Sequence, residues 1–390
     1  AAALAAGNSV LAKPAEQTPL IAAQGIAILL EAGVPPGVVQ LLPGQGETVG
    51  AQLTGDDRVR GVMFTGSTEV ATLLQRNIAS RLDAQGRPIP LIAETGGMNA
   101  MIVDSSALTE QVVIDVLASA FDSAGQRCSA LRVLCLQDEI ADHTLKMLRG
   151  AMAECRMGNP GRLTTDIGPV IDSEAKANIE RHIQTMRSKG RPVFQAVREN
   201  SEDAREWQSG TFVAPTLIEL DDFAELQKEV FGPVLHVVRY NRNQLPELIE
   251  QINASGYGLT LGVHTRIDET IAQVTGSAHV GNLYVNRNMV GAVVGVQPFG
   301  GEGLSGTGPK AGGPLYLYRL LANRPESALA VTLARQDAEY PVDAQLKAAL
   351  TQPLNALREW AANRPELQAL CTQYGELAQA GTQRTPSVRP

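Results

Sequence analysis

One cysteine of this chain lies where a catalytic nucleophile would be expected. Cys128 stands in the segment GQRCS at residues 125–129, just past a predicted helix and behind a glycine that lets the backbone turn. A thiolate is a strong nucleophile, and its addition to an aldehyde carbon forms a hemithioacetal. The alternative is a buried structural thiol, a common role of a lone free cysteine and the one expected for Cys135 and Cys155.

An acidic residue that could act as a base follows a short apolar run. Glu94 begins the sequence ETGG at the end of a predicted strand, and Gly96 and Gly97 let backbone approach a ligand closely. Parallel sheets place ligands beyond the carboxyl ends of their strands, so Glu94 could activate the water that hydrolyses a thioester. A simple strand-end turn is an equal alternative.

Two segments near the start of the chain suit a dinucleotide. Gly66 and Ser67, in the sequence FTGS, join a predicted strand to a helix whose free N–H groups and positive dipole end suit a pyrophosphate. Lys13 and Glu16 follow the first predicted strand and could reach a ribose and an adenine. The alternatives are an ordinary N-capping serine and a solvated ion pair.

Later segments offer a carboxylate beside a ring and a set of backbone donors. Glu229 and Phe231, in EVFGP, could hold a ribose diol and pack beside a nicotinamide; the alternative is a polar turn with the ring buried in the core. NRNMVGA at residues 286–292 offers backbone N–H groups to an anion, and PFGG at 298–301 opens a glycine-rich loop. For both loops the alternative is a flexible segment without a ligand.

The elements that must position these residues alternate between strands and helices. Strands are predicted at residues 8–12, 38–42, 59–64, 90–94, 101–103, 133–136, 216–219, 235–238, 259–264 and 282–285. Helices are predicted at residues 19–32, 47–53, 65–82, 110–124, 140–153, 174–189, 245–253 and 268–277. This rhythm is typical of a parallel sheet with right-handed crossovers, so we expect an α/β protein.

The pattern divides the chain into three parts. Two α/β parts, residues 1–96 and 97–322, are followed by a partly helical C-terminal extension, residues 323–390. Further expectations concern particular segments: a charged surface loop at 198–208, a candidate strand at 328–333, helices within 344–380 broken by Pro353 and Pro365, and a disordered end at 381–390.

Composition argues against several classes of protein. The formal net charge is −8 with both signs scattered, whereas nucleic-acid binding needs a basic face. The five histidines are too dispersed for a zinc site, and no Cys-x-x-Cys pair occurs. No apolar stretch is long enough to span a bilayer. Free thiols indicate a reducing compartment, so we expect a cytoplasmic chain without metal, nucleic acid or membrane span.

Taken in order, these segments resemble the aldehyde dehydrogenase superfamily. The order is GNSVLAKPAEQTPL, FTGS, ETGG, GQRC, EVFGPV and PFGG over about the first 321 residues. The step from Glu94 to Cys128 also fits the family at 128 − 94 = 34 residues. The resemblance implies an aldehyde dehydrogenase-like fold. Residues 1–96 would form an N-terminally incomplete, Rossmann-type NAD-binding domain, and residues 97–322 the catalytic domain.

The resemblance also implies roles for single residues. Cys128 would be the nucleophile that attacks the aldehyde, and Glu94 the general base that directs water to the thioester after hydride transfer. The cofactor would be NAD, with the binding residues Lys13, Glu16, Gly46, Gly66, Ser67, Gly96, Glu229 and Phe231. Glu16 near the ribose hydroxyls favours NAD over NADP, because a 2′-phosphate would meet a like charge.

A narrower resemblance points to L-glutamate γ-semialdehyde (pyrroline-5-carboxylate) dehydrogenases, in particular to that domain of the bifunctional proline utilization A proteins. It rests on the Cys-Ser pair at 128–129, NRNMVGAVVGVQPFGG and SGTGPKAGGPLY. Ser129, Gly291 and Ala292 would anchor the substrate's α-carboxylate, and Phe299 would flank its aliphatic part. The product would be glutamate, which completes proline oxidation.

The same resemblance indicates a fragment of a longer protein. The alanine-rich start is typical of the middle of a helix, and the family's oxyanion asparagine and first strands would lie upstream. The parent is expected to carry a flavin (FAD)-dependent proline dehydrogenase domain and to form a homo-oligomer. Two alternatives are kept: another semialdehyde dehydrogenase, for example for succinate semialdehyde, and an inactive truncated remnant.

Overall fold

Strand–helix–strand crossovers build the first part of the computed structural model, which describes residues 1–83, 86–196, 210–293, 295–323, 344–362, 364, 368 and 371–372. Its elements are α1 (Ala2–Ala5), β1 (Val10–Ala12), α2 (Pro19–Glu31), β2 (Val39–Leu41), the π-helix η1 (Gly46–Gly50), α3 (Ala51–Gly55), β3 (Val62–Thr65), α4 (Thr68–Ala79) and β4 (Leu91–Glu94). β1 pairs with β2 and β3 with β4, both in parallel, as predicted. The two pairs are separate two-stranded sheets rather than one continuous sheet.

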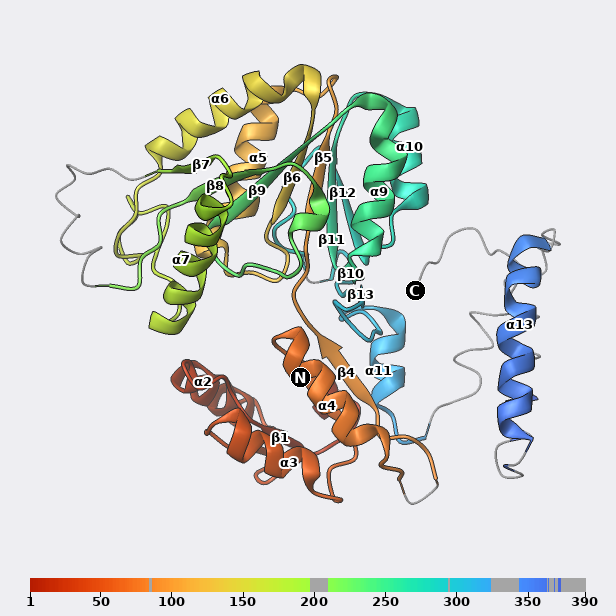
Figure 1. The fold of residues 1–390 in the computed structure, drawn as a ribbon. Helices are drawn as coiled ribbons and strands as arrows, with labels where there is room; N and C mark the ends of the chain where they lie inside the picture. The colour runs from red at the N-terminus through yellow and green to blue at the C-terminus, as the bar shows by residue number, and fades with distance from the viewer. Residues whose placement is uncertain are drawn as a thin grey trace. The chain divides into compact units, whose positions relative to one another are not determined.

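A seven-stranded sheet dominates the next part of the chain (Figure 1). Its strands, in spatial order, are β12 (Asn282–Val285), β11 (Thr260–His264), β5 (Ala100–Val103), β6 (Val133–Gln137), β9 (Val234–Tyr240), β8 (Thr216–Leu220) and β7 (Val193–Gln195). All neighbours are parallel except β7 and β8, which are antiparallel. The α/β class is therefore confirmed.

The helices between these strands follow in the order that the sequence predicts, and they are α5 (Thr109–Phe121), α6 (Asp138–Glu154), α7 (Ser173–Ser188), α9 (Leu245–Ala254) and α10 (Asp268–Ser277). A further helix, α11 (Pro314–Leu320), follows the last strand and was not predicted from the sequence. Short elements complete this part: the 3₁₀ turns η2 (Asp122–Gly125), η3 (Phe223–Glu225) and η4 (Arg242–Gln244), and the antiparallel pair β10 (Tyr257–Gly258) and β13 (Glu302–Gly303). No helix among the described residues combines the length and apolarity that a membrane crossing needs.

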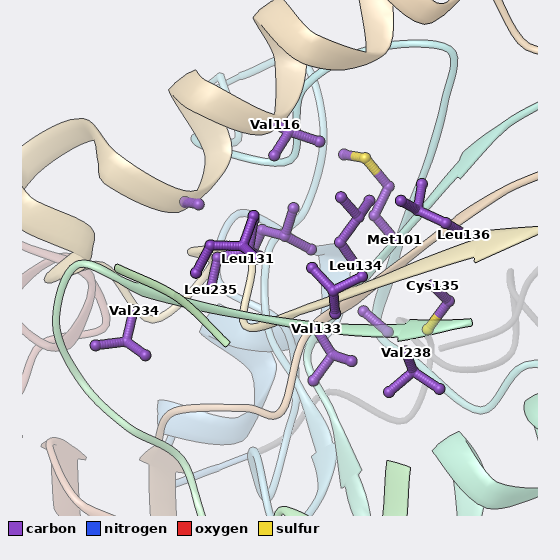
Figure 2. Packing of buried hydrophobic residues seen from close by; sticks show 14 of the residues in the cluster. Met101, Val116, Leu131, Val133, Leu134, Cys135, Leu136, Val234, Leu235 and Val238 are labelled. Atoms are coloured by element: carbon purple, nitrogen blue, oxygen red, sulfur yellow. The ribbon is translucent and has the colours of Figure 1, made fainter. Parts of the chain in front are cut away.

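The core lies around the central strands of this sheet (Figure 2). Every residue of β5 and β6 is buried, and Met101, Leu134 and Leu136 have no exposed surface. Strands covered on both faces have apolar side chains at successive positions, which explains why these runs do not alternate with polar residues. In contrast, α2 buries none of its residues, and Leu20 is 85% exposed.

Some predicted boundaries are wrong for identifiable reasons. The helix predicted to reach Ala124 ends at Phe121, because Ser123 (φ 56°) and Ala124 (φ 54°) adopt left-handed backbone conformations. The helix predicted at 47–53 begins instead as the π-helix η1 and continues as α3.

The chain consists of two units, Ala1–Leu321 and Ala322–Pro390. In the second unit, α13 (Ala344–Ala361) runs through Pro353, so the predicted break there is wrong. The alanines, leucines and glutamines around Pro353 favour helix strongly enough to continue past the hydrogen bond that it removes. Pro365 and the segments predicted at 198–208, 328–333 and 381–390 lie outside the described residues.

We expect Leu134→Ala to lower the free energy of unfolding by about 2–5 kcal/mol, because it leaves a cavity beneath a fully buried strand. Leu163→Ala is the matched control, since Leu163 is fully exposed, and it should change stability by less than about 0.5 kcal/mol. Equilibrium denaturant unfolding followed by circular dichroism measures both variants. Equal losses in the two would contradict the assignment of the core.

Candidate active site

Glu94, the last residue of β4, is half-buried, and its carboxylate lies against the glycine-rich loop. Its Oε2 accepts a hydrogen bond from the Gly301 amide at 3.0 Å, while Oε1 is buried and has no partner among the described residues. A Cβ on Gly300 would lie 2.9 Å from Oε1, and one on Gly306 would lie 3.1 Å from both oxygens. The Glu94 carboxylate thus occupies the space that side chains at positions 300 and 306 would take, so larger residues there would displace it.

Side-chain and backbone hydrogen bonds fix this loop against β4. The Thr95 hydroxyl donates to the Leu304 carbonyl at 2.6 Å, and the Thr95 amide donates to the Ser305 carbonyl at 3.0 Å. The Thr307 hydroxyl accepts a hydrogen bond from the Ala93 amide at 2.9 Å. The position of the Glu94 carboxylate thus depends on residues more than two hundred positions further along the chain.

Burial raises the pKa of Glu94 to about 7, while the Gly301 amide and the Lys310 ammonium act in the opposite direction. The carboxyl group can therefore both release and accept a proton near neutral pH, which a general base requires.

The thiol of Cys128 follows a turn that reverses the chain after α5. The left-handed residues in η2 lead into Gly125, where a Cβ would lie 2.2 Å from the Gly232 carbonyl oxygen. After the turn, Asn99 Nδ2 donates to the carbonyls of Cys128 at 2.7 Å and Ala130 at 2.9 Å. The thiol is thereby placed just before β6 begins, at the amino end of the sheet.

Two carboxylates affect the ionisation of this thiol. Burial raises the pKa of Cys128, and the negative charges of Glu229 and Glu94 raise it further, whereas a hydrogen bond from the Ser129 backbone lowers it. Cys128 therefore stays a neutral thiol at neutral pH unless a base removes its proton. The charges of Glu229 and Glu94 thus act on the Cys128 thiol, although the sequence separates these residues widely.

A buried arginine holds the second carboxylate of the site. The side chain of Arg132 is fully buried, and its Nη2 and Nε donate to Glu229 Oε1 at 2.9 and 3.1 Å. A Cβ on Gly96 would lie only 1.7 Å from Glu229 Oε2, so this carboxylate fills the space beside Gly96. Burial raises the pKa of Glu229, and Arg132 opposes that effect. Arg132 also lies 5.1 Å from the centre of the Phe231 ring, which is 45% exposed rather than buried in the core.

Sequence reasoning missed Arg132, although the sequence contains a signal for it. The residue stands within the apolar run ALRVLCL at 130–136, and a charged side chain in such a run must find partners when the strand is buried. Its guanidinium donates to three further backbone carbonyls, those of Gly125 (2.7 Å), Arg127 (3.1 Å) and Gly232 (3.3 Å). Arg132 thereby joins the turn before Cys128 to the segment that carries Glu229.

Three of the expected cofactor residues lie together after β1 and β2. Lys13 Nζ and Glu16 Oε1 form an ion pair at 3.0 Å, and the same oxygen accepts a hydrogen bond from the Gly46 amide at 2.7 Å. Lys13 also donates to the Gly44 carbonyl at 3.1 Å. These contacts arrange a cation, a carboxylate and a glycine turn at the carboxyl ends of two parallel strands, where such sheets bind ligands.

The expected phosphate contact, Ser67, caps the start of α4. Its Oγ accepts a hydrogen bond from the Val70 amide at 3.2 Å, so the N-capping role is present. Most of the other N–H groups in the first turn of α4 have no partner within the helix. A Cβ on Gly66 would lie 2.4 Å from the Phe64 ring, so the absence of a side chain there leaves room for this ring.

The expected substrate residues come from three separate segments. Ser129 is 4% exposed, Gly291 has a positive φ of 79° in open space, and Ala292 is half-buried. The backbone of Phe299 pairs with Ala311, at 2.9 and 2.8 Å. Among the described residues, no hydrogen bond joins Ser129 to the loop that contains Gly291, and no cluster of metal ligands occurs.

Known proteins share most of this chain. The model of the aldehyde dehydrogenase family matches residues 1–322. Bifunctional protein PutA of Escherichia coli (strain K12) is 99% identical over 384 residues, which are 98% of this chain and 29% of that protein. A 1-pyrroline-5-carboxylate dehydrogenase of Bacillus cereus (strain B4264) is 37% identical over 81% of this chain and 60% of its own length. The chain thus spans less than two thirds of either relative.

Solved structures have the same fold. A crystal structure of a bifunctional proline utilization A (PutA) protein gives a TM-score of 0.76 at 52% identity, over 82% of this chain and 31% of that one. A 1-pyrroline-5-carboxylate dehydrogenase from Thermus with bound NAD gives 0.73 at 38% identity, over 80% and 59%. With the family model matched over residues 1–322, these likenesses show that the chain belongs to the aldehyde dehydrogenase family.

Proposed function

We propose that this chain catalyses the NAD-dependent oxidation of L-glutamate γ-semialdehyde to L-glutamate. The observation that carries the proposal is the Glu94 carboxylate, which the Gly301 amide holds against the glycine-rich loop, which has a pKa of about 7, and whose charge acts on the Cys128 thiol. A nucleophile and a titratable base in one site are what aldehyde oxidation through a thioester requires. We infer the identity of the substrate from relatives that are named 1-pyrroline-5-carboxylate dehydrogenase.

In this proposal the Cys128 thiol loses its proton to a base, and Sγ adds to the aldehyde carbon to form a thiohemiacetal. Bound NAD would supply the acceptor for the hydride that must leave this carbon, so that the thioester on Cys128 can form. Glu94 then removes a proton from a water molecule, which attacks the thioester carbonyl. The carbon–sulfur bond breaks, releasing the carboxylic acid, and a proton restores the thiol.

The residues that would hold NAD suit the groups of that molecule. Lys13, Glu16 and Gly46 form a polar cluster for the adenosine ribose, and the free N–H groups beside Ser67 suit a pyrophosphate. Glu229 would hold the nicotinamide ribose, since Arg132 binds one of its oxygens and thereby fixes the other. Gly66, Gly96 and Phe231 belong to the same proposed site.

The substrate's carboxylate would be bound by neutral donors. We assign it to the Ser129 hydroxyl and the backbone N–H groups of Gly291 and Ala292, with Phe299 against the aliphatic part. We further propose domain boundaries at 96/97 and 322/323, a cytoplasmic location that suits the four free cysteines, and a homo-oligomeric parent with a proline dehydrogenase domain upstream.

Removing the nucleophile should abolish NADH production. We expect Cys128→Ala to lower the rate with NAD and L-glutamate γ-semialdehyde by at least about 10³-fold, because the variant lacks the thiol that is proposed to form the thioester. Absorbance of NADH at 340 nm is the readout. Cys155→Ala is the matched control and should keep the activity; oxidation that survives in Cys128→Ala would refute the role of this thiol.

Thioester hydrolysis should depend on ionisation of Glu94. Because burial raises its pKa to about 7, the carboxylate and the steady-state rate should both increase as pH rises through about 7 and level off above it. Glu94→Gln should lower the rate by about 10²–10⁴-fold and remove this dependence. An unchanged pH profile in Glu94→Gln would rule out Glu94 as the titrating base.

The pH dependence of the free energy of unfolding, measured by denaturant titration, tests the raised pKa of Glu94 independently of activity. The folded protein binds more protons than the unfolded chain between about pH 4.5, the ordinary pKa of a glutamate carboxyl group, and about pH 7, so the free energy of unfolding falls as pH rises through that window. Glu94→Gln should remove a decrease on the order of 1–2 kcal/mol, after allowance for solvent screening.

The choice between NAD and NADP should depend on Glu16. A 2′-phosphate placed near its carboxylate meets a like charge, which is worth about 1 kcal/mol at an exposed site. We therefore expect Glu16→Gln to raise the ratio of kcat/KM for NADP to that for NAD by about 5-fold. Glu47→Gln, which changes the same charge at a nearby position in η1, is the control; an equal effect in both variants would argue against a specific contact.

A further inference from the structure

A buried serine on α5 hydrogen-bonds to both the nucleophile segment and the loop of the proposed carboxylate site. Ser119 has no exposed surface. Its carbonyl accepts a hydrogen bond from the Leu131 amide at 2.9 Å, three residues after Cys128. Its hydroxyl accepts one from the Met289 amide at 3.0 Å, two residues before Gly291, and donates to the Asp115 carbonyl at 2.5 Å.

Other side chains on α5 hold the same loop from its earlier part. Gln111 Nε2 donates to the Asn286 carbonyl at 2.7 Å. Asp115 Oδ2 faces His264 Nε2 at 3.5 Å. Burial lowers the pKa of His264, while Asp115 and a hydrogen bond with the backbone of Arg287 oppose this effect. Positions 111, 115 and 119 are four residues apart and therefore share one face of the helix.

Packing leaves the loop little freedom at the position that Ser119 holds. Met289 has no exposed surface, and a Cβ on Gly262 of β11 would lie 2.9 Å from its sulfur. The backbone at Met289 is thus confined by its side chain and by the Ser119 hydroxyl. The following Gly291 lies in open space, so its amide depends on the orientation of the residues before it.

We propose that Ser119 is a positioning residue that sets the distance between the Cys128 thiol and the backbone donors at Gly291 and Ala292. Gln111 supports the same loop at its start. The inference rests on the proposed function, because it takes these donors as the anchor for the substrate's α-carboxylate. Ser119 would then determine affinity for aldehydes that carry this group, without touching the substrate itself.

Kinetics with two aldehyde substrates distinguish this positioning role from general damage to the fold. In the 390-residue chain, Ser119→Ala should raise KM for L-glutamate γ-semialdehyde about 10-fold while changing kcat/KM for butanal, which has no carboxylate, by less than about 2-fold. Gln111→Ala, at an exposed position, should act in the same direction by about 2–3-fold. Glu110→Ala on the same helix is the control and should change neither value.

Hydrogen exchange supplies a readout that does not need turnover. Ser119→Ala should speed exchange in the peptide over residues 286–292, and L-glutamate, which carries the same carboxylate, should protect this peptide in the unmodified chain but not in the variant. Equal loss with both aldehydes, or unchanged exchange at 286–292, would overturn the inference. A chain that oxidises butanal but not the semialdehyde would contradict the proposed function, and exchange would still decide the role of Ser119.

Discussion

The Glu94 carboxylate lies against a loop whose glycines leave room for it, and the general-base role proposed for this residue depends on its burial there. Residues at 300, 301 and 306 come close enough to exclude most water, and this desolvation raises the pKa of Glu94 to about 7. Without the loop, Glu94 would be an ordinary ionised surface carboxylate. β4 supplies the residue, while a segment far along the chain supplies its environment.

A second buried charge, the guanidinium of Arg132, holds separate segments of the proposed site together. Arg132 binds Glu229 and the turn before Cys128, so a single guanidinium joins the nucleophile to a carboxylate a hundred residues away. Burying this charge is costly, and the cost is offset only because every direction of the guanidinium has an acceptor. Ser119 has a comparable role on the other side of Cys128, where it joins the segment after the thiol to the loop before Gly291. The nucleophile is thus held from two sides by residues that do not themselves react.

Sequence patterns predicted the parts of the structure that local physics determines. The apolar runs of β5 and β6 and the glycine-bounded helices determine a parallel α/β fold, and Cys128 and Glu94 stand out by their places at element ends. Three features depend on distant contacts and were not predictable in this way: the left-handed turn at Ser123, the ion pair of Arg132 and the edge strand β7. The order of the motifs along the chain revealed the family resemblance, and this resemblance implied the residue roles that the spacing of the motifs alone could not decide.

The central claim is that Cys128 forms a thioester that Glu94 hydrolyses. The most direct measurement is mass spectrometry of the peptide containing Cys128, after Glu94→Gln has been mixed with NAD and L-glutamate γ-semialdehyde and quenched within the first turnover. The account predicts a glutamyl thioester on Cys128 that accumulates in the variant and stays scarce in the unmodified chain. An adduct on Cys155, or no covalent adduct while NADH is produced, would contradict it.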